Sequence, residues 1–162
     1  MPNQTTTRIS PEDIQRQNDL CRQIAQLQHS LDTPPLALVQ TYGCQQNEAD
    51  SERLRGYLAQ MGFGFTQDPE QARIVVINTC AIRDHAERKV LGNVGALVHT
   101  KRSHPDQIIC LCGCMAQEPE VAEKIKKSFR HVDLVFGPQA LWRFPEFVHT
   151  LLTRRGRIFE VA

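Results

Sequence analysis

The sequence of 162 residues predicts an α/β protein built on an open, doubly wound parallel sheet of about five strands. From residue 36 onwards, short apolar runs alternate with longer segments of helical periodicity, which is typical of successive βαβ units with right-handed crossovers. The run at residues 74–78 is largely apolar, as strands buried on both faces of a parallel sheet are. A hydrophobic share of 41% suffices for such a core and excludes a disordered chain.

Residues 1–34 are expected to form an N-terminal extension that contains one amphipathic helix. Ser10 can cap this helix, and Pro11 suits its first turn. Apolar residues recur at helical spacing along one face, at Leu20, Ile24, Leu27 and Leu31. Prolines at positions 34 and 35 prevent the helix from continuing. We expect the extension to pack on the domain or on a partner, with Cys21 as a packing residue.

Residues 35–153 are expected to form the α/β domain itself. Its strands are predicted, in order, at residues 36–42, 62–66, 74–78, 108–112 and 132–136. Its helices are predicted at residues 47–61, 83–101, 119–129 and 139–152. Asn47 or Asp50 is the expected cap of the first of these helices. We expect the flavodoxin-like strand order 2-1-3-4-5, followed by a linker at residues 154–162 that leads to a further domain.

The charge balance and the polar amino terminus exclude several classes of protein. Lysine and arginine exceed aspartate and glutamate by one charge, so the chain lacks the basic excess of a typical nucleic-acid-binding domain. No apolar run is long enough to span a membrane, and residues 1–10 lack the apolar core of a secretory signal. We therefore expect a cytoplasmic protein whose six cysteines are thiols.

Three of these cysteines follow predicted strands, at the edge where parallel α/β sheets carry their functional loops. Cys44 follows the first strand, Cys80 the third and Cys114 the fourth. These strands are neighbours in the expected order, so their loops can bring three thiolates onto one metal ion or cluster. Cys110 and Cys112 lie within an apolar strand, where a thiol acts as a small hydrophobic residue, and we exclude them as ligands.

Three thiolates suit either zinc or an iron–sulfur cluster. Zinc would need a fourth ligand, and the nearest histidine in the sequence, His85, lies inside a predicted helix. A 4Fe–4S cluster held by three cysteines would leave one iron without a protein ligand, able to bind and exchange an external one. The lack of a suitable fourth ligand favours the cluster and leaves zinc as the alternative.

Around these cysteines the sequence resembles the radical-SAM methylthiotransferase family over about residues 36–150. The resembling motifs are TYGCQQNEADSE at residues 41–52, NTCAIR at 78–83 and GCMAQ at 113–117. Gln45 and the run Asp50-Ser51-Glu52 favour the MiaB type within this family. The sequence departs from the pattern at Gln46, where Met is commoner, and at Arg73, where Asp is usual.

The resemblance implies an enzyme that adds a methylthio group to C2 of isopentenyl-adenosine at tRNA position 37. Such enzymes use S-adenosylmethionine, a sulfur donor and two 4Fe–4S clusters, one of which generates a radical in a central barrel. The second, auxiliary cluster carries the sulfur and would be held here by Cys44, Cys80 and Cys114. The radical-SAM motif lies outside this sequence. We therefore expect an amino-terminal domain that is inactive alone, with tRNA bound mainly by the missing domains.

Two other functions remain as alternatives. A methylthiotransferase of this frame can act on threonylcarbamoyl-adenosine in tRNA or on a ribosomal protein, although the residues after Cys44 favour isopentenyl-adenosine. The chain can also be a non-catalytic α/β binding module with structural cysteines, but it has no glycine-rich dinucleotide-binding loop. The basic residues at 124–131 are expected to form a solvated surface, and Arg83 a solvated charge at the start of a helix.

Overall fold

The computed structural model describes residues 9–43, 45–80, 84–154 and 156–161. Six parallel strands form one sheet in the order β2-β1-β3-β4-β5-β6. These strands are β1 (Leu36–Tyr42), β2 (Gly64–Phe65), β3 (Ala72–Thr79), β4 (Ile108–Gly113), β5 (Leu134–Phe136) and β6 (Ile158–Glu160). The predicted α/β class and the order 2-1-3-4-5 are confirmed for the first five strands, and the sheet has one strand more than expected.

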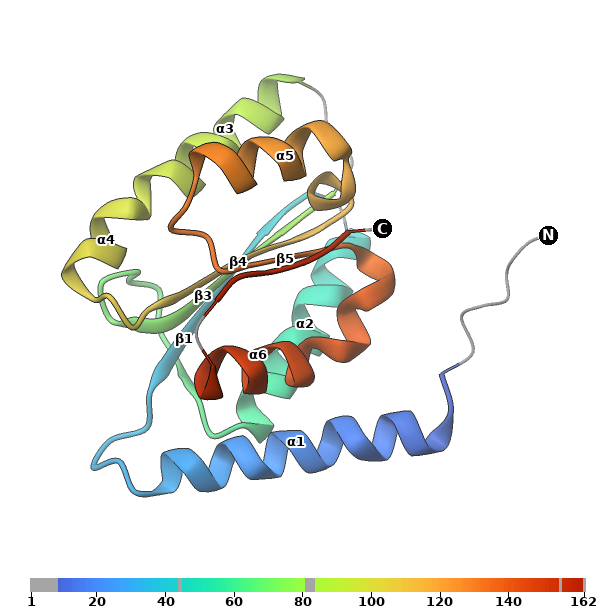
Figure 1. Cartoon of the computed structure of the whole chain (residues 1–162), viewed down its shortest axis with the longest axis vertical. Helices are drawn as coiled ribbons and strands as arrows, with labels where there is room; N and C mark the ends of the chain where they lie inside the picture. Colours follow the sequence, from blue (N-terminus) through green and yellow to red (C-terminus); the bar gives the residue numbers. More distant parts are fainter. Residues whose placement is uncertain (1–8, 44, 81–83, 155, 162) are drawn as a thin grey trace.

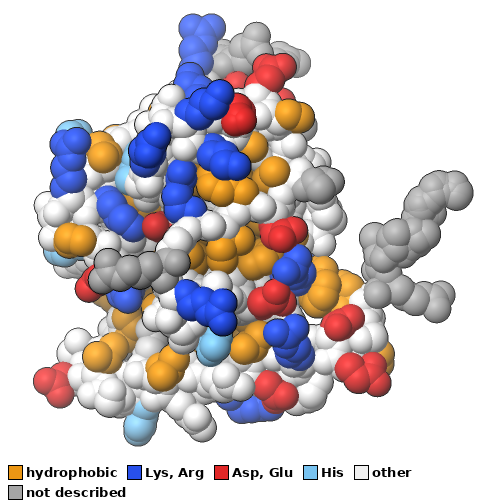
Figure 2. Space-filling view, viewed as in Figure 1, with side chains coloured by type: hydrophobic (Ala, Val, Ile, Leu, Met, Phe, Trp, Pro, Cys, Tyr) orange, Lys and Arg blue, Asp and Glu red, His pale blue; other side chains and the backbone are white. Residues whose placement is uncertain are grey.

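Helices cover both faces of the sheet, with α3, α4 and α5 on one face and α2 and α6 on the other (Figure 1). The helices of these layers are α2 (Gln45–Gln60), α3 (Asp84–Ala96), α4 (Val98–Ser103), α5 (Pro119–Ser128) and α6 (Phe144–Thr153). Two short 3-10 helices are η1 (Met115–Gln117) and η2 (Pro138–Arg143). Lys and Arg side chains gather over the half of the molecule that α3 to α5 cover (Figure 2).

The core consists of two apolar layers, one on each side of the sheet. Successive side chains of a strand point to opposite faces, so β3 contributes to both layers. Ile74 and Val76 pack with the side chains of α2 and α6, whereas Val75 and Ile77 pack with those of α3 and α5. All four side chains are fully buried, which explains why the apolar run of this strand shows no polar alternation.

The N-terminal extension forms α1 (Pro11–His29), which lies outside α2 and α6 as a further layer (Figure 1). Its predicted start is confirmed, because the Ser10 hydroxyl accepts a hydrogen bond from the Asp13 N–H and the Asp13 carboxylate accepts one from the Ser10 N–H. Cys21 and Ile24 are fully buried in the layer of α2 and α6. Burial raises the pKa of the Cys21 thiol to about 11, in agreement with a packing role.

The buried face of α1 differs from the predicted one. Leu27 and Leu31 are 55% and 53% exposed, whereas Gln17 is buried. Gln17 exchanges two hydrogen bonds with Glu146 of α6, and Gln28 donates one to the carbonyl of Met61, the residue after α2. The contact stripe therefore follows positions 17, 21, 24 and 28. Leu20 and Ile24 are buried as predicted, whereas hydrogen-bonded glutamines replace the two exposed leucines in the contact with the domain.

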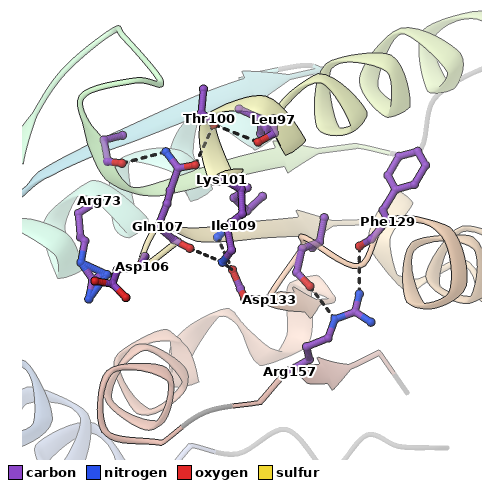
Figure 3. Close-up of polar contacts among 12 residues, drawn as sticks. Arg73, Leu97, Thr100, Lys101, Asp106, Gln107, Ile109, Phe129, Asp133 and Arg157 are labelled. Atoms are coloured by element: carbon purple, nitrogen blue, oxygen red, sulfur yellow. Dashed lines mark hydrogen bonds and ion pairs between the residues drawn. The ribbon is translucent and has the colours of Figure 1, made fainter. Parts of the chain in front are cut away.

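The predicted linker at residues 154–162 contains β6, which pairs with β5 and was missed. Arg157 accounts for the position of this strand. Its guanidinium donates to four backbone carbonyls within residues 125–132, at 2.8 to 3.2 Å. Figure 3 shows the bond to Phe129 among them. The last carbonyls of a helix lack intrahelical partners, so Arg157 satisfies the end of α5 and fixes the chain that enters β6.

Two predicted helices are each divided in two. The helix expected at 83–101 is interrupted between α3 and α4, and residues 81–83 lie outside the described part of the chain. The helix expected at 139–152 begins as η2, because Pro145 fits only the first turn of a new α-helix. Among the residues that the structure describes, no helix is both long and apolar enough to cross a membrane.

Candidate functional site

The carboxyl ends of β1, β3 and β4 lie side by side at one level of the sheet. Tyr42 pairs with Thr79, and Thr79 pairs with Gly113, each as the last residue of its strand. The loops that follow β3 and β4 begin with Cys80 and Cys114. The structure thus places Cys80 and Cys114 at the start of adjacent loops, at the edge that the strand order predicted.

The third predicted ligand, Cys44, lies outside the described residues, so its role stays a prediction. The residue before it is described. Gly43 has a φ of +135°, and a Cβ built on it would lie 2.5 Å from the Cys80 sulfur and 2.6 Å from the Asn47 Oδ1 atom. A residue without a side chain is needed here for both reasons, since L-residues rarely adopt this φ. The chain that leads to Cys44 therefore runs directly against the sulfur of Cys80.

Gly113 connects β4 to the loop of Cys114 at a similarly close approach. Its φ is +100°, and a Cβ at this position would lie only 1.9 Å from the carbonyl oxygen of Thr79. The same oxygen accepts a hydrogen bond from the Cys114 N–H at 3.2 Å. The expectation that Gly113 ends the strand and releases Cys114 into the loop is confirmed in this geometry.

Burial separates the candidate ligands from the other described cysteines. Cys80 and Cys114 are partly exposed, whereas Cys110 and Cys112 are buried within β4. Burial raises the pKa of both strand thiols, and the Cys112 thiol donates to the Asn78 Oδ1 atom at 3.8 Å. A cysteine binds metal as a thiolate. The environment of the strand cysteines therefore opposes metal binding, in agreement with their exclusion from the sequence.

The donor set at this edge fits a soft metal or an iron–sulfur cluster. Two partly exposed thiols lie on adjacent loops, and the absence of a side chain at Gly43 leaves space beside one of them. Within the described ranges, no three His, Cys, Asp or Glu side chains form a metal-binding group. A third thiol would have to come from Cys44, as the sequence predicts.

A buried polar network supports the three strand ends. The expectation that Asn47 or Asp50 is the N-cap of α2 is wrong, because the helix begins at Gln45 and includes both residues. The Asn47 side-chain N–H donates to the Thr79 carbonyl at 2.7 Å. Asn78 donates to the Asn47 carbonyl at 2.9 Å and to the Ser51 hydroxyl at 3.0 Å. The Ser51 and Thr41 hydroxyls lie 2.6 Å apart. Sequence reasoning missed this network, although Asn47, Ser51 and Asn78 all fall inside the cysteine motifs.

The basic surface of α5 is remote from this edge. Lys124, Lys126, Lys127 and Arg130 are exposed, and they lie in or after the second half of α5. This helix starts beside the loop of Cys114 and ends near the amino end of β5, so its cations flank the opposite edge of the sheet (Figures 1 and 2). Lys126 lies over the Phe159 ring, 5.6 Å from its centroid. Arg83 lies outside the described residues.

The fold and these loops define a doubly wound α/β domain that gathers cysteines at the carboxyl edge of its sheet. The profile of the family described as "Uncharacterized protein family UPF0004" matches residues 37–137. The chain belongs to this family, which forms the amino-terminal domain of MiaB-type enzymes. The resemblance noted from the cysteine motifs is thereby confirmed.

Individual relatives carry a more specific name. The chain is 43% identical over 153 residues to the tRNA-2-methylthio-N(6)-dimethylallyladenosine synthase of Alkaliphilus oremlandii, and the match covers 94% of this chain and 32% of the relative. It is 40% identical over 157 residues to the protein of the same name from Acetivibrio thermocellus, covering 94% and 33%. The match to the Clostridioides difficile protein of this name is 46% over 113 residues, covering 70% and 24%. The chain spans about a third or less of the length of these relatives, in their amino-terminal part.

Proposed function

We propose that this chain is the cluster-binding part of a cytoplasmic tRNA methylthiotransferase that acts on isopentenyl-adenosine, also called dimethylallyl-adenosine. The observation that carries the proposal is the alignment of three strand ends whose next residues lead to Cys44, Cys80 and Cys114. The name of the relatives supports the substrate, since it specifies a methylthio group on this base in tRNA. The alternatives, another substrate or a structural module, have no observation of their own in their favour.

In this proposal, Cys44, Cys80 and Cys114 hold an auxiliary 4Fe–4S cluster. When bound, such a cluster supplies one iron without a protein ligand, to which an external sulfur can attach. The residues of the chain provide the setting for the three thiolates. Gly43 keeps the space beside the Cys80 sulfur open, and the Cys112 thiol is buried within β4, where it donates to the Asn78 Oδ1 atom.

The remainder of the reaction belongs to sequence that this chain does not span. The radical chemistry would need S-adenosylmethionine and a second 4Fe–4S cluster, for which the sequence offers no motif here, and a sulfur donor. Most tRNA contacts are also assigned to the longer enzyme, in keeping with a net charge of only +1 for this chain. The 162-residue chain alone is expected to bind the auxiliary cluster without methylthiolating tRNA.

Anaerobic reconstitution with iron and sulfide tests the proposal. The wild-type chain should take up about four irons, as the proposed cluster requires. Single Cys→Ala variants at positions 44, 80 and 114 should lose the iron, whereas the matched variants Cys21→Ala and Cys110→Ala should retain it. These controls remove cysteines that lie in the core and that the proposal does not use.

Two results would contradict the proposal. Zinc retained by the same three cysteines in place of iron would make the site structural and favour the binding-module alternative. Iron uptake that survives the loss of any one loop cysteine, but not the loss of Cys110, would move the site into β4. A radical-SAM relative of full length, assayed with tRNA and with ribosomal protein, separates the possible substrates.

A further inference from the structure

One backbone oxygen joins the chain segments of all three loop cysteines. The carbonyl of Thr79, the residue before Cys80, accepts a hydrogen bond from the Cys114 N–H at 3.2 Å. It also accepts one from the side-chain N–H of Asn47 at 2.7 Å. Asn47 lies three positions after Cys44 in the same motif. The position of this oxygen therefore couples the starts of the three loops to one another.

The Asn47 side chain is held in place from several directions. It is 5% exposed, and a Cβ on Gly43 would lie 2.6 Å from its Oδ1 atom, so the amide also lies against the loop that leads to Cys44. Its backbone carbonyl accepts a hydrogen bond from the side chain of Asn78, which is 1% exposed. These two asparagines thus tie α2 to β3 in both directions. The Asn47 side chain of α2 donates to a backbone carbonyl of β3, and the Asn78 side chain of β3 donates to a backbone carbonyl of α2.

We propose that Asn47 is a positioning residue of the cysteine site, which holds the loops of Cys80 and Cys114 in register with that of Cys44 through the Thr79 carbonyl. This inference rests on the proposed function, because it concerns the geometry of the same three ligands. Asn47 does not itself bind the cluster; it acts by fixing the oxygen that both neighbouring loops share. Loss of a group that orients metal ligands weakens metal binding by about 10- to 100-fold in general.

The alternative is that Asn47 only stabilises the fold, and the chain offers a matched control for it. Gln107, labelled in Figure 3, is also a buried side-chain amide, 1% exposed. It donates to the carbonyls of Pro69 and Ala72 at 2.8 and 2.9 Å. Ala72 begins β3, whereas Thr79 ends it. Gln107 and Asn47 therefore satisfy backbone oxygens at opposite ends of β3, and only Asn47 lies at the end that carries the loop cysteines.

The experiment compares Asn47→Asp with Gln107→Glu in the 162-residue chain, because each exchange keeps the shape and removes the N–H donors. Iron per chain after anaerobic reconstitution, the rate of iron loss to a chelator, and the electron paramagnetic resonance spectrum of the reduced cluster are measured beside the urea midpoint. We expect both variants to have lower urea midpoints. Only the Asn47 variant should lose iron about tenfold faster or more, with an altered spectrum. Asn47→Ala and Gln107→Ala repeat the comparison without a buried carboxylate.

The outcomes separate this inference from the proposed function. Equal iron retention and equal spectra in the two variants, or equally fast loss from both, would overturn the positioning role and leave the cluster intact as a proposal. A wild-type chain that takes up no iron would overturn the proposed function. In that case, capture of the iron-free protein by a trivalent arsenical that bridges neighbouring thiols still decides the positioning role. Capture should be about tenfold slower in the Asn47 variants and unchanged in the Gln107 variants.

Discussion

Replacing Gly43 by alanine tests whether the loop before Cys44 is built around the sulfur of Cys80. The added Cβ would lie 2.5 Å from this sulfur, whereas ordinary contacts between such atoms are about 3.5–4.0 Å. The sulfur or the loop must therefore move by about 1 Å. Metal–ligand distances tolerate only about 0.2 Å. We expect Gly43→Ala to lose most of its capacity to bind iron.

Gly156 provides a control with the same backbone strain and no such contact. Its φ is +138°, close to the +135° of Gly43, and no described atom lies within 4 Å of a Cβ built on it. An L-residue in the left-handed region costs about 1–2 kcal/mol. The reduced freedom of the unfolded chain offsets about 0.4–1 kcal/mol of this. The backbone conformation should therefore cost each variant about 1 kcal/mol, measured by urea unfolding of the iron-free chain, and Gly43→Ala should lose more than this because of its contacts.

The comparison of iron content with stability decides the argument. Gly43→Ala should fall well below the wild type in iron per chain, and Gly156→Ala should match the wild type despite the same backbone strain. If both variants bind iron as the wild type does, the contact between Gly43 and the Cys80 sulfur does not control the site. If both lose iron in parallel with stability, the effect is one of folding, and the reasoning from this contact is refuted.

Three further predictions concern the stability of the fold. Gly113→Ala should lower the free energy of unfolding by about 3 kcal/mol or more in urea titrations. Its Cβ would meet rigid backbone 1.9 Å away and break the hydrogen bond of the Cys114 N–H. A loss under about 1 kcal/mol would contradict this geometry. The hydrogen bond from Arg143 holds the pKa of Glu146 below its ordinary value. The stabilisation from Glu146 is thus present above the ordinary pKa of about 4.3 and is lost as the pH falls below it. Glu146→Gln should therefore make the urea midpoint less sensitive to acid. An unchanged pH profile would exclude this. Arg157→Lys should lower the free energy of unfolding by about 2 kcal/mol or more, because an ammonium group cannot reproduce the planar guanidinium that donates to four carbonyls. A melting curve like that of the wild type would show that β6 does not depend on Arg157.

The strands and their order could be predicted because each strand carries its signal in its own residues. Apolar runs such as residues 74–78 mark strands that are buried on both faces, and right-handed crossovers leave few orders for five of them. The same logic predicts that Cys80 and Cys114 lie at one edge of the sheet, where the register of β3 and β4 places them. The role of Cys44 remains a prediction from its equivalent position after β1.

The features that the sequence did not reveal depend on partners distant along the chain. β6 is three residues long, too short to show alternation, and its place follows from the contact of Arg157 with the end of α5. The buried face of α1 includes Gln17, whose partner Glu146 lies 129 residues away. A glutamine on a helix gives no local sign that its amide will be satisfied by another element. Hydrophobic periodicity therefore predicts a buried Leu27, whereas the neighbouring Gln28 makes the contact with the domain.

The placement of buried polar groups argues that the carboxyl edge is specified for more than stability. Burying an amide or a hydroxyl costs free energy unless every hydrogen bond is recovered, and an apolar residue of similar shape is often as stable. Asn47, Ser51, Asn78 and Thr79 are all buried beneath the cysteine loops, and no buried side-chain N or O atom in the described ranges lacks a partner. Such a satisfied network has one geometry in which all its bonds form, whereas apolar packing tolerates small shifts. A network that fixes register is what three ligands from separate loops require, since each must reach the same cofactor within a fraction of an ångström.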